Sequence, residues 1–135
     1  MAAIQTPTPT ATEPILRLLH RQPVHVSLDT TLRVCAQVMA EESIGAVLVR
    51  GPHGPAGVLT ERDVVVALSE GADADEDRAR DFMTPDIDGV PEMTTIAEAG
   101  RRMLRNEIRH LAVTRDGRTV GVISSRDVLA VLAIG

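Results

Sequence analysis

The sequence repeats itself, and this repetition restricts the fold more than any other feature. The stretch GVLTERD at residues 57–63 returns as GVISSRD at residues 121–127, an offset of 64 residues. The same offset aligns threonines, methionines and apolar residues without a gap, from about residue 19 to the C-terminus. Such self-similarity is typical of a structural unit that occurs twice. A chain of 135 residues can hold both units in one compact body.

The spacing of apolar residues predicts the first elements of each unit. Residues 94–105 have apolar side chains at the period of an amphipathic helix, and Thr95 with Glu98 forms a capping box at its start. Residues 44–49 and 108–113 are apolar runs of strand length, each followed by a turn and a second apolar run. We therefore expect one helix and two further strands in each copy.

The last element of each unit is ambiguous when it is read alone. VVVAL at residues 64–68 is rich in β-branched residues, which favours a strand, whereas its counterpart VLAVLAI at residues 128–134 favours a helix. Because duplicated units share a fold, we predict a helix in both. The dipeptide Asp116-Gly117 also predicts a tight hairpin in the second copy.

The expected fold class is α/β (α+β), with two tandem β-α-β-β-α units related by pseudo-two-fold symmetry. Each unit is a small sheet packed against two helices. We expect a flexible polar tail over residues 1–13, the first unit over residues 14–70, a solvated acidic linker over residues 71–79 and the second unit over residues 80–135.

Composition excludes several classes of partner. The formal net charge is −5 and no basic run is present, so we expect no nucleic-acid binding. The longest apolar run is too short to span a bilayer, and the N-terminus lacks the basic and apolar segments of a signal peptide. We therefore expect a cytoplasmic protein without a membrane contact. All 14 basic residues are arginine, which is typical of a GC-rich bacterial source.

Neither metal binding nor catalysis is indicated. The one cysteine, Cys35, shares a predicted helix face with Leu32 and Met39, so we expect a core residue. The four histidines show no helical i, i+4 pair, and we expect no metal site. No Ser/His/Asp or Cys/His constellation can be assembled, so we expect that the chain is not an enzyme.

The repeated stretches place a hydroxyl and a carboxylate at each strand-to-helix junction. Thr60 and Ser124 fall where the strand gives way to a helix, and Asp63 and Asp127 follow in the first helical turn. A carboxylate there can accept hydrogen bonds from the two hydroxyls of a ribose. The same residues also form capping boxes that need no ligand. The glycine that opens each stretch permits close approach of a ligand or of another backbone segment.

The unit resembles the CBS domain, and the chain resembles a tandem CBS pair, or Bateman module. GVLTERDVVVAL and GVISSRDVLAVL match the Gly-x-x-Thr/Ser-x-x-Asp signature of that family. RDFMTPD at residues 80–86 is similar to the stretch that opens the second unit of such pairs, and PILRLLHRQP at residues 14–23 is a weaker version for the first. The resemblance covers residues 14–135.

The resemblance implies binding of an adenosyl ligand, namely AMP, ADP, ATP or S-adenosylmethionine, in clefts between the units. In this family the aspartate contacts the ribose, the Thr or Ser lies near it, and the preceding strand holds the adenine. Carried onto this chain, the resemblance implies a first cleft of Thr60, Asp63, Ile44, Gly45, Ala46, Thr84 and Ile87, and a second cleft of Ser124, Asp127, Ile108, Arg109, His110, Pro23 and Val24.

The two expected clefts differ in charge. Arg109 and His110 can pair with a phosphate, whereas Gly45 and Ala46 at the equivalent positions cannot. We therefore predict that the Asp127 cleft is the tighter site for a charged nucleotide.

The leading functional interpretation is a regulatory adenine-nucleotide sensor that signals to a separate effector protein and requires no cofactor. The alternative is a ligand-free module for dimerisation or protein interaction. The helix at residues 128–134 is apolar on nearly every face, so we expect a homodimer formed through helices 61–69 and 126–134. The alternative there is a helix buried entirely within one chain.

Overall fold

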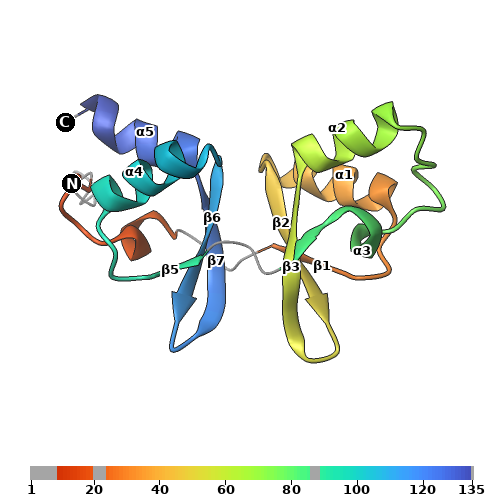
Figure 1. Ribbon diagram of the computed structural model, residues 1–135, viewed down its shortest axis with the longest axis horizontal. Helices are drawn as coiled ribbons and strands as arrows, with labels where there is room; N and C mark the ends of the chain where they lie inside the picture. The colour runs from red at the N-terminus through yellow and green to blue at the C-terminus, as the bar shows by residue number, and fades with distance from the viewer. Residues whose placement is uncertain (1–8, 20–23, 86–88, 135) are drawn as a thin grey trace, which may run out of the picture.

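The computed structural model describes residues 9–19, 24–85 and 89–134, which form two lobes that lie side by side (Figure 1). Lobe 1 comprises residues 24–85, and lobe 2 comprises residues 9–19 and 89–134. The elements of lobe 1 are β1 (His25–Ser27), α1 (Leu32–Glu42), β2 (Ala46–Gly51), β3 (Gly54–Thr60), α2 (Glu61–Ser69), α3 (Ala79–Phe82) and β4 (Thr84–Pro85). The elements of lobe 2 are the 3-10 helix η1 (Ile15–Leu18), β5 (Gly89–Pro91), α4 (Ile96–Asn106), β6 (His110–Arg115), β7 (Arg118–Ser124) and α5 (Ser125–Ile134).

The predicted α/β fold with two β-α-β-β-α units is confirmed. Lobe 1 has a sheet in the order β1-β2-β3-β4, and lobe 2 has a sheet in the order β5-β6-β7. In each lobe the first strand pairs in parallel with the second, which pairs antiparallel with the third. The register shifts between Val49 and Arg50 in one sheet and between Val113 and Thr114 in the other, which are equivalent positions of the repeat.

The two uncertain local predictions are also confirmed. The β-branched stretch at residues 64–68 lies within α2, where Val64 and Ala67 face the core of lobe 1. Asp116 and Gly117 form the two-residue turn between β6 and β7 with positive φ values of 51° and 78°. Positive φ at both positions is the conformation that an Asp-Gly hairpin turn requires.

Each lobe has its own apolar core. In lobe 1, α1 buries Leu32, Cys35 and Met39 against the sheet, which confirms the expected core position of the cysteine. Burial raises the pKa of the Cys35 thiol to about 11, so the thiol is protonated at neutral pH. In lobe 2, α4 buries Ile96, Ala99 and Met103 in the same way.

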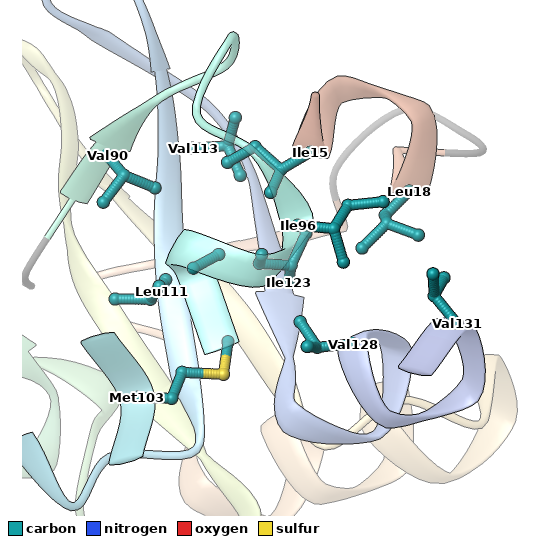
Figure 2. Packing of buried hydrophobic residues seen from close by; sticks show 11 residues of the cluster. Ile15, Leu18, Val90, Ile96, Met103, Leu111, Val113, Ile123, Val128 and Val131 are labelled. Carbon is teal, nitrogen blue, oxygen red and sulfur yellow. The ribbon is translucent and has the colours of Figure 1, made fainter. Parts of the chain in front are cut away.

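The core of each lobe is completed by the segment that precedes the other lobe. Ile15 and Leu18 of η1 point into the core of lobe 2, beside Ile96 and Val131 (Figure 2), although they come before lobe 1 in the sequence. Ala79 of α3 is buried in lobe 1. We call this arrangement the crossed packing.

Equivalent backbone hydrogen bonds hold both crossed segments. The Ile15 N–H donates to the Thr94 carbonyl at 2.8 Å, and the Ala79 N–H donates to the Thr30 carbonyl at 2.8 Å. The donors and the acceptors are each related by the offset of the repeat. The sequence units at residues 14–70 and 80–135 are therefore not the same as the packed lobes.

Residues 9–13 of the expected loose tail contact lobe 2 through their backbone, and residues 1–8 lie outside the described residues. The carbonyl of Glu13 accepts from the Ile96 N–H, and the carbonyl of Ala11 accepts from the Ala97 N–H, both at 2.9 Å. The first turn of a helix has N–H groups without an intrahelical partner, and these carbonyls supply the partners for α4. The polar composition of the N-terminal residues predicted exposed side chains, but it could not predict that their backbone carbonyls would accept hydrogen bonds from α4.

The acidic linker is attached to α1 in the same way, rather than being merely solvated. The Leu32 N–H donates to the carbonyl of Asp77 at 3.0 Å, and the Arg33 N–H donates to the carbonyl of Ala74 at 2.9 Å. The side chains of Arg33 and Asp75 form an exposed ion pair. The linker thus occupies in lobe 1 the place that the N-terminal segment occupies in lobe 2.

Candidate functional site

A cavity of about 810 Å³ lies between the two lobes. Its size falls within the range of small-molecule sites in proteins. Lobe 1 contributes Val24, the C-terminal half of α1, the start of β2 and the start of α2, and lobe 2 contributes the end of η1, the start of β6, the end of β7 and the first turn of α5. The lining side chains used below are Leu18, Leu19, Val24, Met39, Ile44, Gly45, Ala46, Glu61, Arg109, His110, Ser124, Arg126 and Asp127.

The polar groups come mainly from lobe 2. Ser124 is the last residue of β7, and Asp127 lies in the first turn of α5, which begins at the next residue. His110 opens β6 and is the ladder partner of Ser124, so both face the same end of the sheet. The Arg109 carbonyl accepts from the Ser125 N–H at 2.8 Å, which fixes the start of α5 against β6. Two arginines, a histidine and a carboxylate thereby border one part of the cavity.

Aliphatic side chains from both lobes also line the cavity. Leu18 and Leu19 come from lobe 2, whereas Val24, Met39 and Ile44 come from lobe 1. Neither a tyrosine nor a tryptophan exists in the chain, and Phe82 is the one phenylalanine. A planar ring bound here would therefore contact aliphatic side chains and backbone rather than stack on an aromatic residue.

Of the three predicted capping boxes, the two at the repeated stretches are formed. The third is only half formed, because the Glu98 N–H donates to Oγ1 of Thr95 while the Glu98 carboxylate accepts from Arg101 and Arg105. The Thr60 N–H donates to Oδ2 of Asp63 at 2.8 Å, and the Asp63 N–H donates to Oγ1 of Thr60 at 3.1 Å. In lobe 2 the Ser124 N–H donates to Oδ2 of Asp127 at 2.8 Å, and the Asp127 N–H donates to Oγ of Ser124 at 3.2 Å. The capping interpretation is thus confirmed. Within the described part of the chain, Oδ1 of each aspartate accepts no hydrogen bond.

The structure distributes the expected site residues unequally. Ser124, Asp127, Arg109, His110 and Val24 line the cavity, as expected for the second cleft. Ile44, Gly45 and Ala46 also line it, although we expected them beside Asp63, which does not.

The correction has a geometric reason. Strand β2 contacts β7 across the lobe boundary. Residues 44–46 at the start of β2 therefore line the same cavity as the first turn of α5. The repeat fixed the equivalent residues in each unit but not which lobe faces them.

The other expected residues lie elsewhere or outside the described residues. Thr60 contributes to the cap of α2 and does not line the cavity. Ile108 packs against the core of lobe 2. Thr84 is exposed and pairs with Val58 in the sheet of lobe 1. Pro23 and Ile87 fall in the ranges that the structure does not describe.

Sequence reasoning missed Glu61, which lines the cavity beside His110. A Cβ atom placed on Gly45 would lie 3.3 Å from Oε1 of Glu61 and 3.7 Å from Nε2 of His110, so the glycine lets both side chains approach the lobe boundary. Glu61 directly follows the signature hydroxyl of the first unit, where the second unit has Ser125. That difference between the copies was the available signal.

The environment of His110 lowers its pKa. The imidazole is half-buried, and burial is the largest cause because it disfavours the charged form. Glu61, Asp127 and Asp63 act in the opposite direction, and Arg109 adds to the lowering. Because its pKa lies below the ordinary value, the His110 imidazole stays neutral over a wider range of pH than a solvated imidazole would.

The described ranges carry neither a metal centre nor a helix that could span a membrane. No group of three or more His, Cys, Asp or Glu side chains there is arranged to hold a metal ion. Among those same residues, no helix has the length and apolar character needed to cross a membrane.

Known structures share the fold of this chain. A CBS domain protein from Pyrobaculum aerophilum, complexed with AMP, is 29% identical, with a TM-score of 0.77 over 90% of this chain and 99% of that one. A CBS-domain containing protein from Agrobacterium tumefaciens is 27% identical, with a TM-score of 0.81 over 96% of this chain and 99% of that one.

Sequence relatives are similar over parts of their length. A protein of Methanopyrus kandleri is 36% identical over 71% of this chain and 50% of its own length. A 17.7 kDa protein of Acidianus ambivalens is 34% identical over 79% of this chain and 65% of its own length. Hypoxic response protein 1 of Mycobacterium tuberculosis is 31% identical over 73% of this chain and 70% of its own length. The chain thus spans half to two thirds of the first two relatives.

The family assignment follows from the repeat itself. The model of the CBS domain matches residues 15–70 and again residues 79–134, so each copy of the repeat is recognised separately. The two matches together cover most of the chain, and the structures that it resembles are CBS-domain proteins. The chain therefore belongs to the CBS domain family, as a tandem pair.

Proposed function

We propose that the chain is a regulatory module that binds an adenosine nucleotide in the cavity between its lobes. One observation carries the proposal: the lining of this cavity combines a carboxylate, a hydroxyl and cationic groups with several aliphatic side chains. That combination suits a ligand with a polar sugar phosphate and a flat apolar base. The relative from Pyrobaculum aerophilum, which is complexed with AMP, supports the choice of ligand class.

Asp127 and Ser124 are the proposed ribose contacts. Oδ2 of Asp127 is engaged by the Ser124 N–H, but Oδ1 is available to accept from the ribose hydroxyls. The cap holds the carboxylate in one orientation before the ligand arrives, which reduces the entropy lost on binding. Capping and ribose binding are therefore compatible roles of one side chain.

Arg109, Arg126 and His110 are the proposed phosphate contacts. All three line the cavity near the first turn of α5, where the N–H groups of the helix also favour an anion. The part of the cavity wall from Ile44 to Ala46, together with Val24, is proposed to hold the adenine. This arrangement favours AMP, ADP or ATP over S-adenosylmethionine, which carries no phosphate.

The position of the cavity supports the proposed regulatory role. Its walls belong to both lobes, so a ligand that contacts both stabilises one relative arrangement of the lobes. A separate effector protein that distinguishes the arrangements would then respond to the nucleotide. We propose no catalytic step, since this function requires only binding.

We propose further that two copies associate through α2 and α5. Their exposed apolar residues include Val65, Leu68, Leu129 and Leu132, which are 65%, 48%, 61% and 42% exposed, and Val65 also lies at the edge of the cavity. Val65 and Leu129 are equivalent in the repeat, as are Leu68 and Leu132. A face built from equivalent pairs is suited to a second copy related by a two-fold axis.

The second candidate function is a ligand-free interaction module. The observation in its favour is that both aspartates already satisfy the backbone of their own helices. In that case the exposed apolar face, and not the cavity, would carry the function.

Paired aspartate variants test the nucleotide proposal. Both Asp127→Ala and Asp63→Ala remove one capping box, and each should cost about 1 kcal/mol of stability. Only Asp127→Ala also removes a cavity contact, so it should weaken AMP binding about 10- to 100-fold in isothermal titration calorimetry. Asp63→Ala is the matched control and should bind AMP nearly as the unmodified protein does.

The outcome separates the two candidates. If Asp63→Ala abolishes binding while Asp127→Ala does not, the proposed site is wrong. If no adenosine compound binds or shifts the melting temperature, and none is released on denaturation, the interaction module is favoured. Because the chain contains no Trp or Tyr, released nucleotide would dominate the ultraviolet spectrum.

A further inference from the structure

His110 lies where the two lobes meet inside the cavity. It belongs to β6 of lobe 2, yet its Nε2 would be 3.7 Å from a Cβ atom on Gly45 of lobe 1. Glu61 of lobe 1 approaches the same glycine to 3.3 Å through Oε1. An imidazole and a carboxylate from different lobes therefore border one small region.

Charged groups from three elements surround this imidazole. Glu61 and Asp63 belong to the first turn of α2, Asp127 belongs to the first turn of α5, and Arg109 precedes β6. The three carboxylates favour the protonated imidazole, whereas Arg109 and burial disfavour it. Burial has the largest effect, and it holds the pKa of His110 below the ordinary value of 6.5.

An anion bound in the cavity would reverse this balance. A phosphate beside Arg109 offsets the effect of the guanidinium and adds negative charge to that of the three carboxylates. Nearby negative charge stabilises the imidazolium, and a hydrogen bond to a phosphate oxygen does so directly. The pKa of the His110 imidazole therefore rises when the anion binds.

We propose that binding of a phosphate-bearing adenosine ligand in this cavity is coupled to uptake of a proton by His110. The proton comes from the solvent, and no covalent bond to the ligand forms. This inference rests on the proposed function, because it concerns the same cavity, and it adds a dependence on pH and a preference for phosphorylated ligands.

The direction of the pH dependence follows from linkage. The free protein holds His110 with a pKa below 6.5, and the phosphate raises that pKa in the complex. Affinity for the phosphorylated ligand therefore rises as the pH falls from above the pKa of His110 in the complex toward its pKa in the free protein. Protonation of the phosphate itself, near about pH 6, limits the gain at the acid end.

Calorimetry in buffers of different ionisation enthalpy measures the proton directly. At about pH 7 the unmodified protein should take up about half a proton for each AMP bound, and none for each adenosine, which lacks the phosphate. His110→Gln should abolish the uptake. His53→Gln changes an exposed histidine in the turn between β2 and β3, so it should behave as the unmodified protein does.

A second measurement uses the unmodified protein, so it does not depend on a variant that still binds AMP. The pKa of the His110 imidazole can be followed by NMR in the unmodified protein, with His110→Gln used only to assign its signals. The pKa should rise by about one unit or more with saturating AMP and should be unchanged with adenosine.

The outcomes distinguish this inference from the function on which it rests. AMP binding without proton uptake and without a rise in the His110 pKa would overturn the inference alone. Equal proton uptake with AMP and adenosine would also overturn it, because the phosphate would not be the cause. If no adenosine compound binds, both proposals are wrong.

Discussion

Gly57 and Gly121 occupy equivalent positions in the two units but face different neighbours. A Cβ atom on Gly57 would lie 2.5 Å from the backbone carbonyl oxygen of Thr84, whereas one on Gly121 would lie 2.7 Å from Cδ2 of Leu19. A backbone carbonyl in a sheet cannot move easily, but the end of a leucine side chain can rotate. The same glycine therefore has a stricter role in lobe 1.

The matched alanine variants should differ in stability. Gly57→Ala is expected to lower the free energy of unfolding by about 1–3 kcal/mol, because β4 must shift away from β3. Gly121→Ala is expected to cost about 1 kcal/mol or less, since Leu19 can yield. Urea unfolding of the two variants measures the difference. Equal losses would show that the carbonyl of Thr84 is not the obstacle.

At the residue scale, the sequence predicted which kinds of side chain line the cavity better than it predicted which lobe supplies each of them. Asp127, Ser124, Arg109 and His110 were identified because the repeat marks the strand-to-helix junctions. Ile44, predicted beside Asp63, lines the cavity that Asp127 borders, because equivalence within a repeat does not say which surfaces of the two copies meet. That information lies in the contact between β2 and β7, which no local pattern encodes.

Among the elements, α2 and α5 share two features, a capped first turn and exposed apolar side chains. The helical state of α2 was predictable only by comparison with α5, because three consecutive valines favour a strand when read alone. Burial of Val64 and Ala67 on one face, together with the cap, outweighs that propensity.

A charge among the exposed apolar residues of α5 should disrupt the proposed dimer. Leu129→Glu is expected to convert a dimer to a monomer in sedimentation velocity at micromolar concentration, because it would bury an unpaired carboxylate at the interface. Leu104→Glu is the matched control, because Leu104 is 81% exposed on α4, outside the proposed face. It should leave the mass unchanged. A monomeric mass for the unmodified protein would contradict the dimer.

For the whole molecule, the crossed packing is the feature that a linear reading could not supply. Tail and linker compositions are polar, so they indicated exposed segments. Their backbone carbonyls nevertheless complete the first turns of α4 and α1, and Ile15 and Ala79 enter the two cores. Such partners become visible only in three dimensions, because the hydrogen bonds join residues far apart in the sequence.

The crossed packing predicts where a mutation acts. Ile15→Ala should lower the free energy of unfolding by about 2–4 kcal/mol, since a fully buried side chain leaves a cavity. Hydrogen exchange should show lost protection first in β5, β6 and β7 of lobe 2, although Ile15 precedes lobe 1. Val26→Ala in β1 is the control and should loosen lobe 1 first. Loosening of lobe 1 by Ile15→Ala would contradict the crossed packing.

Only one of the two lobes depends on a distant part of the chain. Lobe 1 is built from one continuous stretch that includes α3, whereas lobe 2 receives Ile15 and Leu18 from before lobe 1. A fragment that begins at residue 24 would therefore keep the core of lobe 1 whole and leave a hole in lobe 2, so the two halves of the repeat are not interchangeable as independent pieces.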